Sequence, residues 1–142
     1  FNGPYGEMHL SDTDAPALFI AGGSGMAPLK CILHQMKNEK IDRKVLYFFG
    51  ANKPSEMFYM EEMKAFEESL HDFEFVPVVA NPGDEQWDGE TGLVTEPLGR
   101  RVDDASPYEA YLCGSPGMID ATVKVLREKG IKEENIFYDK FA

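Results

Sequence analysis

The sequence predicts an α/β domain in which a doubly wound, five-stranded parallel sheet has helices on both faces. Three observations predict it. Short, nearly continuous apolar runs alternate along the chain with stretches of helical periodicity, as in βα units. The runs lack polar alternation, which is typical of parallel strands covered on both faces. A glycine cluster ends the first run, and a proline then opens a helix. The expected strands are residues 17–21, 45–50, 73–79, 108–113 and 135–138.

Helices are expected between these strands because apolar residues recur there at intervals of three and four. The series are Met26, Leu29, Ile32, Leu33 and Met36, then Tyr59, Met63, Phe66 and Leu70, and finally Ile119, Val123 and Leu126. The last helix has the clearest limits, with Ser115 as N-cap, Pro116 at its first position and Gly130 as its stop. Right-handed crossovers join such units.

Pro77 predicts the order of the strands. It lies inside the third run and cannot donate a ladder hydrogen bond, so this strand is expected at an edge. The order 3-2-1-4-5 places it there and makes the first strand central. Ligands of such sheets bind at the switch point, here between strands one and four. Those strands end in the turns at 22–28 and 113–118, so we predict a nucleotide site between them.

Composition limits the possible functions. The 142 residues fit one domain, and the net charge of −11 argues against nucleic acid and anionic membrane surfaces as partners. No apolar run approaches the roughly 20 residues of a membrane span. Cys31 and Cys113 indicate reduced, intracellular thiols, and a cytoplasmic location is expected. His9, His34 and His71 have no metal-ligand spacing, and no metal site is predicted.

The first residues differ from the rest of the chain. A turn at 3–6 is followed by a polar linker that contains Asp12 and Pro16. This segment is either a frayed tail or the last strand of a preceding domain. We expect residues 1–14 to be the end of that domain plus the linker, and residues 15–142 to be the nucleotide-binding domain.

The turn at 22–28 suits an anion, because the first N–H groups of a helix lack partners and the helix dipole is positive there. No G-x-x-x-x-G-K-[ST] motif is present, which argues against a P-loop NTPase. The dinucleotide pattern G-x-G-x-x-G is met only in part, because Pro28 stands at the last position.

Four motifs resemble the ferredoxin–NADP reductase superfamily. Residues 23–28 (GSGMAP) resemble its G-[TS]-G-[IM]-x-P, and 113–118 (CGSPGM) resemble its C-G-x-P-x-M. Residues 3–6 (GPYG) are similar to the end of its flavin-binding barrel, and 87–94 (WDGETGLV) to its W-x-G-x-x-G-x-[VI]. Gly50 and Ala51 together with residues 56–59 (EMFY) most resemble the F subunit of Na⁺-translocating NADH:quinone reductase and phenol hydroxylase-type NADH reductases.

The resemblance implies the NAD(P)-binding domain of a flavin-dependent oxidoreductase. Hydride would pass from NADH to FAD on a covalently linked upstream domain. Electrons would then go to a 2Fe-2S cluster elsewhere in the parent chain, a quinone system or an oxygenase. This chain alone is expected to be inactive. The alternative is a non-catalytic nucleotide-binding or assembly module of a larger redox complex.

The resemblance also implies roles for individual residues. Gly23, Ser24, Gly25 and Met26 would hold the pyrophosphate through N–H groups. The other implied cofactor-binding residues are Pro28, Ala51, Asn52, Glu56, Tyr59, Gly114, Pro116 and Met118. Cys113 and Phe141 are the implied catalytic residues, with the thiol near the hydride path and the ring over the isoalloxazine.

Several of these residues have a purely structural alternative. Cys113 could be a small buried hydrophobe at a strand end. Met118 and Tyr59 could be packing residues, Trp87 could anchor a loop, and Phe141 could be a frayed end.

NAD is favoured over NADP because positive charge is missing where a 2′-phosphate would need it. NADP-preferring relatives have a Ser-Arg pair after the third strand, whereas this chain has Ala80, Asn81 and Pro82. Lys53 is the only basic candidate nearby.

Overall fold

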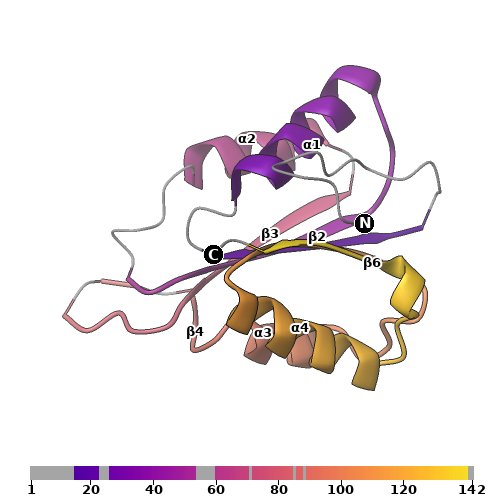
Figure 1. Ribbon diagram of the computed structural model, residues 1–142. Helices are drawn as coiled ribbons and strands as arrows, with labels where there is room; N and C mark the ends of the chain where they lie inside the picture. Colours follow the sequence, from indigo (N-terminus) through magenta and orange to yellow (C-terminus); the bar gives the residue numbers. More distant parts are fainter. Residues whose placement is uncertain are drawn as a thin grey trace.

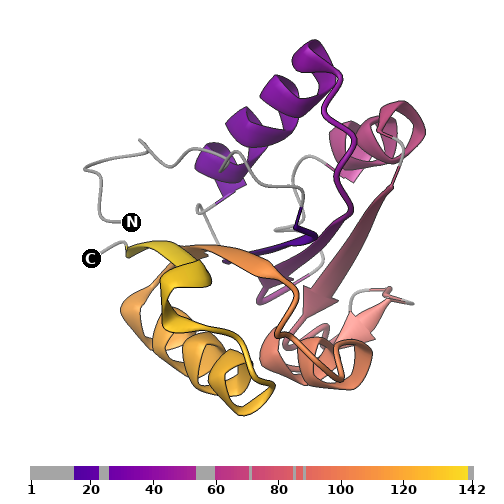
Figure 2. The ribbon, with the colours of Figure 1, turned by 90° about the vertical axis from the view of Figure 1, so that its right-hand side faces the viewer.

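The computed structural model describes residues 15–22, 26–53, 60–70, 72–84, 86–87 and 89–140. Six strands form one parallel sheet in the order β4-β3-β2-β1-β5-β6 (Figure 1). Their bounds are β1 Ala17–Gly22, β2 Val45–Ala51, β3 Phe73–Val79, β4 Glu90–Thr91, β5 Glu109–Gly114 and β6 Ile136–Lys140. β4 and β6 lie at opposite edges of the sheet (Figure 2).

The α/β class and the parallel sheet are confirmed, but the prediction of five strands was wrong. The five expected strands lie in the expected relative order, and β4 is the additional strand at the edge beyond β3. β4 has two residues, Glu90 and Thr91, which pair with Val78 and Val79. A run of two residues has no periodicity that could reveal it.

Pro77 lies on β3 just before the part that β4 covers. The N–H of Phe75 donates to Glu67 Oε2 at 2.9 Å instead of to a neighbouring strand. Pro77 is two residues further along, so its backbone nitrogen faces the same side and has no hydrogen to donate. The prediction that β3 is an edge strand was wrong, because β4 pairs with Val78 and Val79 on its outer side. At Phe75 and Pro77, however, this outer side is closed to further strand pairing.

Among the described residues, four α-helices cover the two faces of the sheet. Their bounds are α1 Met26–Glu39, α2 Met60–Ser69, α3 Thr95–Arg101 and α4 Pro116–Glu128, and the 3₁₀ helix η3 spans Glu133–Asn135. α1 and α2 cover one face, while α3 and α4 cover the other (Figure 1). α3 is a helix that the sequence analysis did not predict. No helix within the described ranges has the length and apolar character needed to cross a bilayer.

Central strand β1 contributes to two hydrophobic cores. Phe19 and Ala21 belong to the core under α1 and α2, whereas Leu18 and Ile20 belong to the core under α3 and α4. All four are fully buried. This explains why the strand is apolar at every position, as predicted for a parallel strand covered on both faces.

The expected limits of the last helix are confirmed. The Ser115 hydroxyl accepts the N–H of Met118 at 3.3 Å, which caps α4, and Pro116 occupies its first turn. Gly130 follows the last residues of the helix with φ +97°, a conformation that favours glycine.

The amino ends of the strands are closed by a buried ion pair. Arg43, between α1 and β2, contacts Glu109 Oε1 at the start of β5 with a distance of 3.1 Å. The same guanidinium donates to the Ala15 carbonyl at 2.7 Å, and the Tyr111 hydroxyl donates to Glu109 at 3.2 Å. The Glu109 N–H donates to the Pro16 carbonyl at 2.9 Å. These contacts fix the direction from which the chain enters β1.

Candidate nucleotide-binding site

A crevice of about 330 Å³ lies at the carboxyl ends of β1, β2, β3 and β5. It is lined by Gly22, Gly50, Ala51, Asn52, Ala80, Gly92, Leu93, Val94, Ser115 and Met118. β1 and β5 are neighbours, but the helices that follow them cover opposite faces of the sheet (Figure 1). The crevice is thus at the topological switch point, where open α/β sheets bind ligands.

The strand before residues 23–25 and the helix after them are present as predicted. β1 ends at Gly22 and α1 begins at Met26. Gly23, Ser24 and Gly25 lie outside the described residues, as do the side chains of Met26 and Pro28. The first turn of α1 contains no acidic residue, so no carboxylate there opposes an anion at the helix N-terminus.

The residues after β5 lie next to the end of β1. Gly114 is buried at the strand end, and Ser115 and Pro116 are exposed at the start of α4. The half-buried Met118 side chain lines the crevice and also packs against the core under α3 and α4. Gly114, Pro116 and Met118 are therefore gathered at this end of the sheet, as the sequence predicted.

Cys113 lies at the end of β5 opposite Ala21 of β1. Its side chain is fully buried in the core under α1 and α2, with Phe19 and Tyr47 as members of the same cluster. Burial raises the pKa of Tyr47 well above its usual value, and the nearby Cys113 raises it further. This burial agrees with the structural alternative for Cys113, and its role near the hydride path stays a prediction.

Residues after β2 and β3 form another side of the crevice. Ala51 and Asn52 line it, with Ala51 almost buried and Asn52 exposed. The N–H groups of Ala80 and Asn81 donate to the Ala51 and Asn52 carbonyls, each at 2.8 Å. The strand pairing thus continues past the strand ends. Glu56 and Tyr59, predicted to bind cofactor here, lie outside the described residues, as does Phe141.

Residues 89–94 lie beside the crevice, and Trp87 packs against them. The Trp87 indole N–H donates to the Glu90 carbonyl at 2.8 Å. A Cβ added at Gly89 would lie 2.8 Å from the Trp87 ring, so this glycine leaves room for the indole. Gly92 adopts φ +99° and donates its N–H to the Val79 carbonyl at 3.0 Å. These contacts favour Trp87 as an anchor for the loop.

This segment brings Leu93 to the crevice, a residue that the sequence analysis did not single out. Its side chain is 65% exposed and lines the crevice. The Leu93 N–H donates to Glu96 Oε2 at 2.8 Å, which holds the residue at the start of α3. In the sequence, the position of Leu93 directly after Gly92 in the W-x-G-x-x-G-x-[VI] motif could have indicated that it lies at the site.

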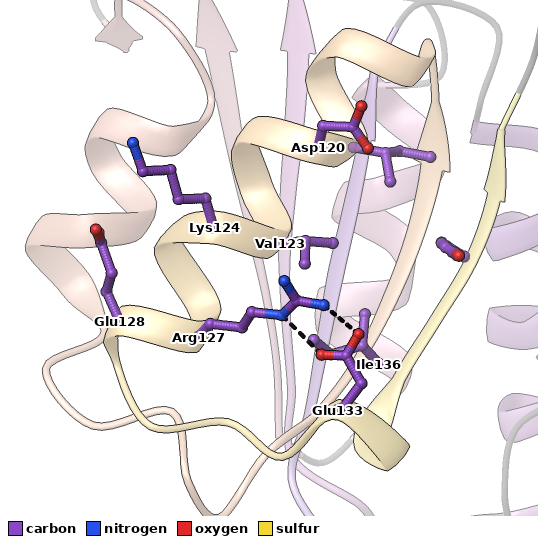
Figure 3. Close-up of a pocket in the computed structure, with 9 residues that line it drawn as sticks. Asp120, Val123, Lys124, Arg127, Glu128, Glu133 and Ile136 are labelled. Atoms are coloured by element: carbon purple, nitrogen blue, oxygen red, sulfur yellow. Dashed lines mark hydrogen bonds and ion pairs between the residues drawn. The ribbon is translucent and has the colours of Figure 1, made fainter.

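A larger cavity of about 630 Å³ lies between α4 and β6 (Figure 3). Figure 3 shows Arg127 and Glu133 joined across it by two contacts. This ion pair raises the pKa of Arg127 and lowers that of Glu133, because each charge stabilises the other. The cavity contains none of the predicted site residues, so the crevice at the strand ends is the candidate site.

Comparison with known proteins identifies the family. The oxidoreductase NAD-binding domain family matches residues 19–124, most of the chain. The chain belongs to this family. The predicted resemblance to the NAD-binding domain of ferredoxin–NADP reductase-like proteins is confirmed, and the crevice of this NAD-binding domain is at the position expected for the nucleotide.

Relatives of this NAD-binding domain are reductases. The F subunit of the Na⁺-translocating NADH-quinone reductase of Idiomarina loihiensis is 38% identical over 99% of this chain and 36% of its own length. The reductase component of propane 2-monooxygenase from Rhodococcus jostii is 39% identical over 99% of this chain and 39% of its own. This chain therefore spans less than half the length of these relatives.

A solved structure has the same fold. The cytochrome P450 reductase of Amycolatopsis superposes with a TM-score of 0.86 and 28% identity, covering 98% of this chain and 42% of that one. The prediction of an oxidoreductase domain that binds NAD is confirmed by the family match and these relatives together.

Proposed function

We propose that this domain binds NADH in the crevice and presents the nicotinamide to FAD on a covalently linked domain that precedes residue 15. In this proposal residues 1–14, which lie outside the described residues, are the end of a flavin-binding barrel plus the linker. Bound FAD would accept a hydride from nicotinamide and release the electrons to a further acceptor. This chain supplies nucleotide binding and orientation.

The observation that supports the proposal is a crevice with glycines at or next to the ends of the neighbouring strands. Gly22 at the end of β1 and Gly50, the residue before the last of β2, line the crevice, and β5 ends at Gly114 next to it. A Cβ added at Gly50 would lie 3.3 Å from the Val94 side chain, so the strand ends and the turn at 92–94 approach each other closely. Val94 and Met118 take the space that side chains at these glycines would occupy, so the nucleotide would lie on a surface made by both backbone and these two side chains.

Each part of the crevice suits a different part of NADH. The N–H groups of residues 23–26 at the start of α1 would hold the pyrophosphate. Gly114 and Pro116 would flank the nicotinamide, with Cys113 beneath them. Ala51 and Asn52, together with Glu56 and Tyr59, would contact the adenosine side. The exposed Leu93 offers the apolar surface that a base requires.

NAD is the proposed nucleotide instead of NADP. Asn52 and Lys53 are exposed beside the crevice, and Asp84 is exposed after β3. A 2′-phosphate there would have one lysine as a partner and a carboxylate nearby, whereas a ribose hydroxyl needs only amide or carboxylate partners.

The acceptor is proposed from the relatives. They include a component of a quinone reductase and the reductase of a monooxygenase, so a quinone system or an oxygenase is the proposed acceptor class. A 2Fe-2S cluster elsewhere in the parent chain would convert a two-electron donor into single electrons. We place the reaction on the cytoplasmic side, where NADH is supplied.

The test is anaerobic mixing of the full-length flavin-loaded protein with NADH, followed by flavin absorbance. We expect rapid bleaching with NADH and a far lower kcat/KM with NADPH, while this chain alone reduces no dye. Comparable kcat/KM values for the two nucleotides would contradict the NAD preference. A parent protein that binds NADH but holds no flavin would instead support the non-catalytic module.

A further inference from the structure

Met118 lies across the ends of β1 and β5. A Cβ added at Gly22 would be 2.8 Å from Met118 Sδ, and one added at Gly114 would be 2.8 Å from Met118 Cε and 3.1 Å from Sδ. Real Cβ atoms essentially never approach another heavy atom within 3.0 Å. The Met118 thioether therefore fills the space that side chains at both glycines would occupy.

The backbone of Met118 is held in place. Its N–H donates to the Ser115 hydroxyl at 3.3 Å, and its carbonyl accepts the Thr122 hydroxyl at 2.8 Å. Thr122 is fully buried, so this second contact is shielded from water. Only the flexible part of the side chain beyond Cβ is able to change position.

A displaced Met118 side chain has room to move only toward the crevice. On one side it packs against the core under α3 and α4, which includes the fully buried Ile119 and Leu112. Protein interiors are close-packed and accept little extra volume. On the other side is the crevice of about 330 Å³ that Met118 lines. A group added at Gly22 would push the thioether into this crevice.

We propose that Met118 forms the floor of the NADH crevice and that Gly22 and Gly114 lack side chains so that the thioether lies flat between them. Met118 is thus a positioning residue that sets the depth of the crevice where the nucleotide passes from the β1 turn to the β5 turn. This inference rests on the proposed function.

Gly22→Ala is the decisive variant. Gly22 is not among the glycines with positive φ, so alanine is compatible with its backbone. The full-length protein is titrated with tetrahydro-NADH, which cannot donate a hydride. We expect the variant to bind this analogue about ten- to a hundredfold more weakly than the wild-type protein does, because the displaced thioether and the nucleotide would overpack the crevice. The melting temperature should change little, because Met118 can move.

The double variant Gly22→Ala/Met118→Ala provides the rescue. Removing the thioether should return the affinity to that of Met118→Ala alone. Gly50→Ala is the matched control, because it lines the same crevice but its Cβ would meet Val94 at 3.3 Å, not Met118. Met118→Ala should not rescue it. Equal rescue of both glycine variants, or of neither, overturns the inference.

Two further measurements distinguish a failure of the proposed function from a failure of the role of Met118. The carbon-13 methyl resonance of Met118, assigned by its loss in Met118→Leu, should shift when the analogue binds, and an unshifted resonance would contradict the role of Met118. If Gly22→Ala does not fold, Met118→Phe takes its place and should weaken binding. Wild-type protein that does not bind the analogue overturns the proposed function. If the wild-type protein binds the analogue and Gly22→Ala or Met118→Phe binds it equally well, only the role of Met118 is overturned.

Discussion

The two ends of the sheet are built in opposite ways. At the carboxyl ends, Gly22, Gly50 and Met118 line an open crevice, and the Met118 thioether lies over Gly22 and Gly114. At the amino ends, Arg43 and Glu109 form an ion pair whose side chains are only 3% and 8% exposed. One end leaves room for a ligand, and the other is filled by the protein's own charges. Stability and binding are thereby assigned to different ends of the same strands.

The largest expected effect comes from Glu109→Gln, which removes the buried carboxylate and leaves the Arg43 charge in place. Breaking one partner of a buried pair costs about 3–5 kcal/mol, because the remaining charge stays desolvated. Urea unfolding should show this loss in the free energy of unfolding, with NADH affinity unchanged wherever the variant is folded.

Two controls separate this effect from a general loss of charge. The double variant Arg43→Met/Glu109→Leu removes both charges, and it should recover most of the stability because neither desolvated charge remains. Arg100→Ala breaks the partly exposed pair with Glu90, at 2.7 Å, and should cost only about 0–1 kcal/mol. A Glu109→Gln loss no larger than that of Arg100→Ala would contradict the importance of the amino end.

The sequence predicted the carboxyl end far better than the amino end. The glycine turns at 22–28 and 113–118 are contiguous motifs that follow continuous apolar runs. The edge position inferred from Pro77 was wrong, but the relative order of the five expected strands was right. Arg43 and Glu109 are 66 residues apart, and neither has a local pattern that reveals its partner. Only the folded sheet brings them together.

The sequence did not predict β4 and α3 because neither segment has a strong local preference for strand or helix. β4 is two residues long, and its pairing depends on β3 and on the turn at Trp87. α3 contains Pro97 and Gly99, both poor helix formers, and the buried Pro97 and Leu98 tie it to the sheet. Tertiary packing therefore decides both. Leu93 was missed for a related reason, since its exposure beside the crevice is a property of the fold.

Two buried tyrosines in the same core differ in whether their hydroxyl groups are hydrogen-bonded. Tyr47 and Tyr111 are both fully buried, and the Tyr111 hydroxyl donates to Glu109 at 3.2 Å. In the part of the chain that the structure describes, the Tyr47 hydroxyl has no hydrogen-bond partner. Tyr111→Phe should destabilise by about 1 kcal/mol, whereas Tyr47→Phe should stabilise by about 1 kcal/mol, because it removes an unsatisfied buried group. Chemical denaturation at neutral pH measures both, and equal losses would contradict the contrast.

Tyr47 also predicts a dependence on alkaline pH. Burial raises the pKa of its folded-state hydroxyl well above 10.0, so only the unfolded chain ionises near that pH. The folded state then binds more protons than the unfolded state, and the free energy of unfolding falls as pH rises above the unfolded pKa. Tyr47→Phe should make this fall shallower in denaturation series from neutral to alkaline pH. An identical slope in both proteins would show that Tyr47 ionises normally.

The smallest expected effect is at a glycine that belongs to neither end. Gly99 lies inside α3, where an added Cβ would meet nothing within 4 Å and the φ angle is not positive. Gly99→Ala should therefore stabilise the domain by about 0.5–1 kcal/mol, because alanine loses less conformational entropy in a helix. Affinity for the NADH analogue should stay at the wild-type value, in contrast to Gly22→Ala. Thermal unfolding and the same titration give both quantities. Lost affinity in Gly99→Ala would mean that binding depends on α3 itself, and the division between the two ends of the sheet would then be too simple.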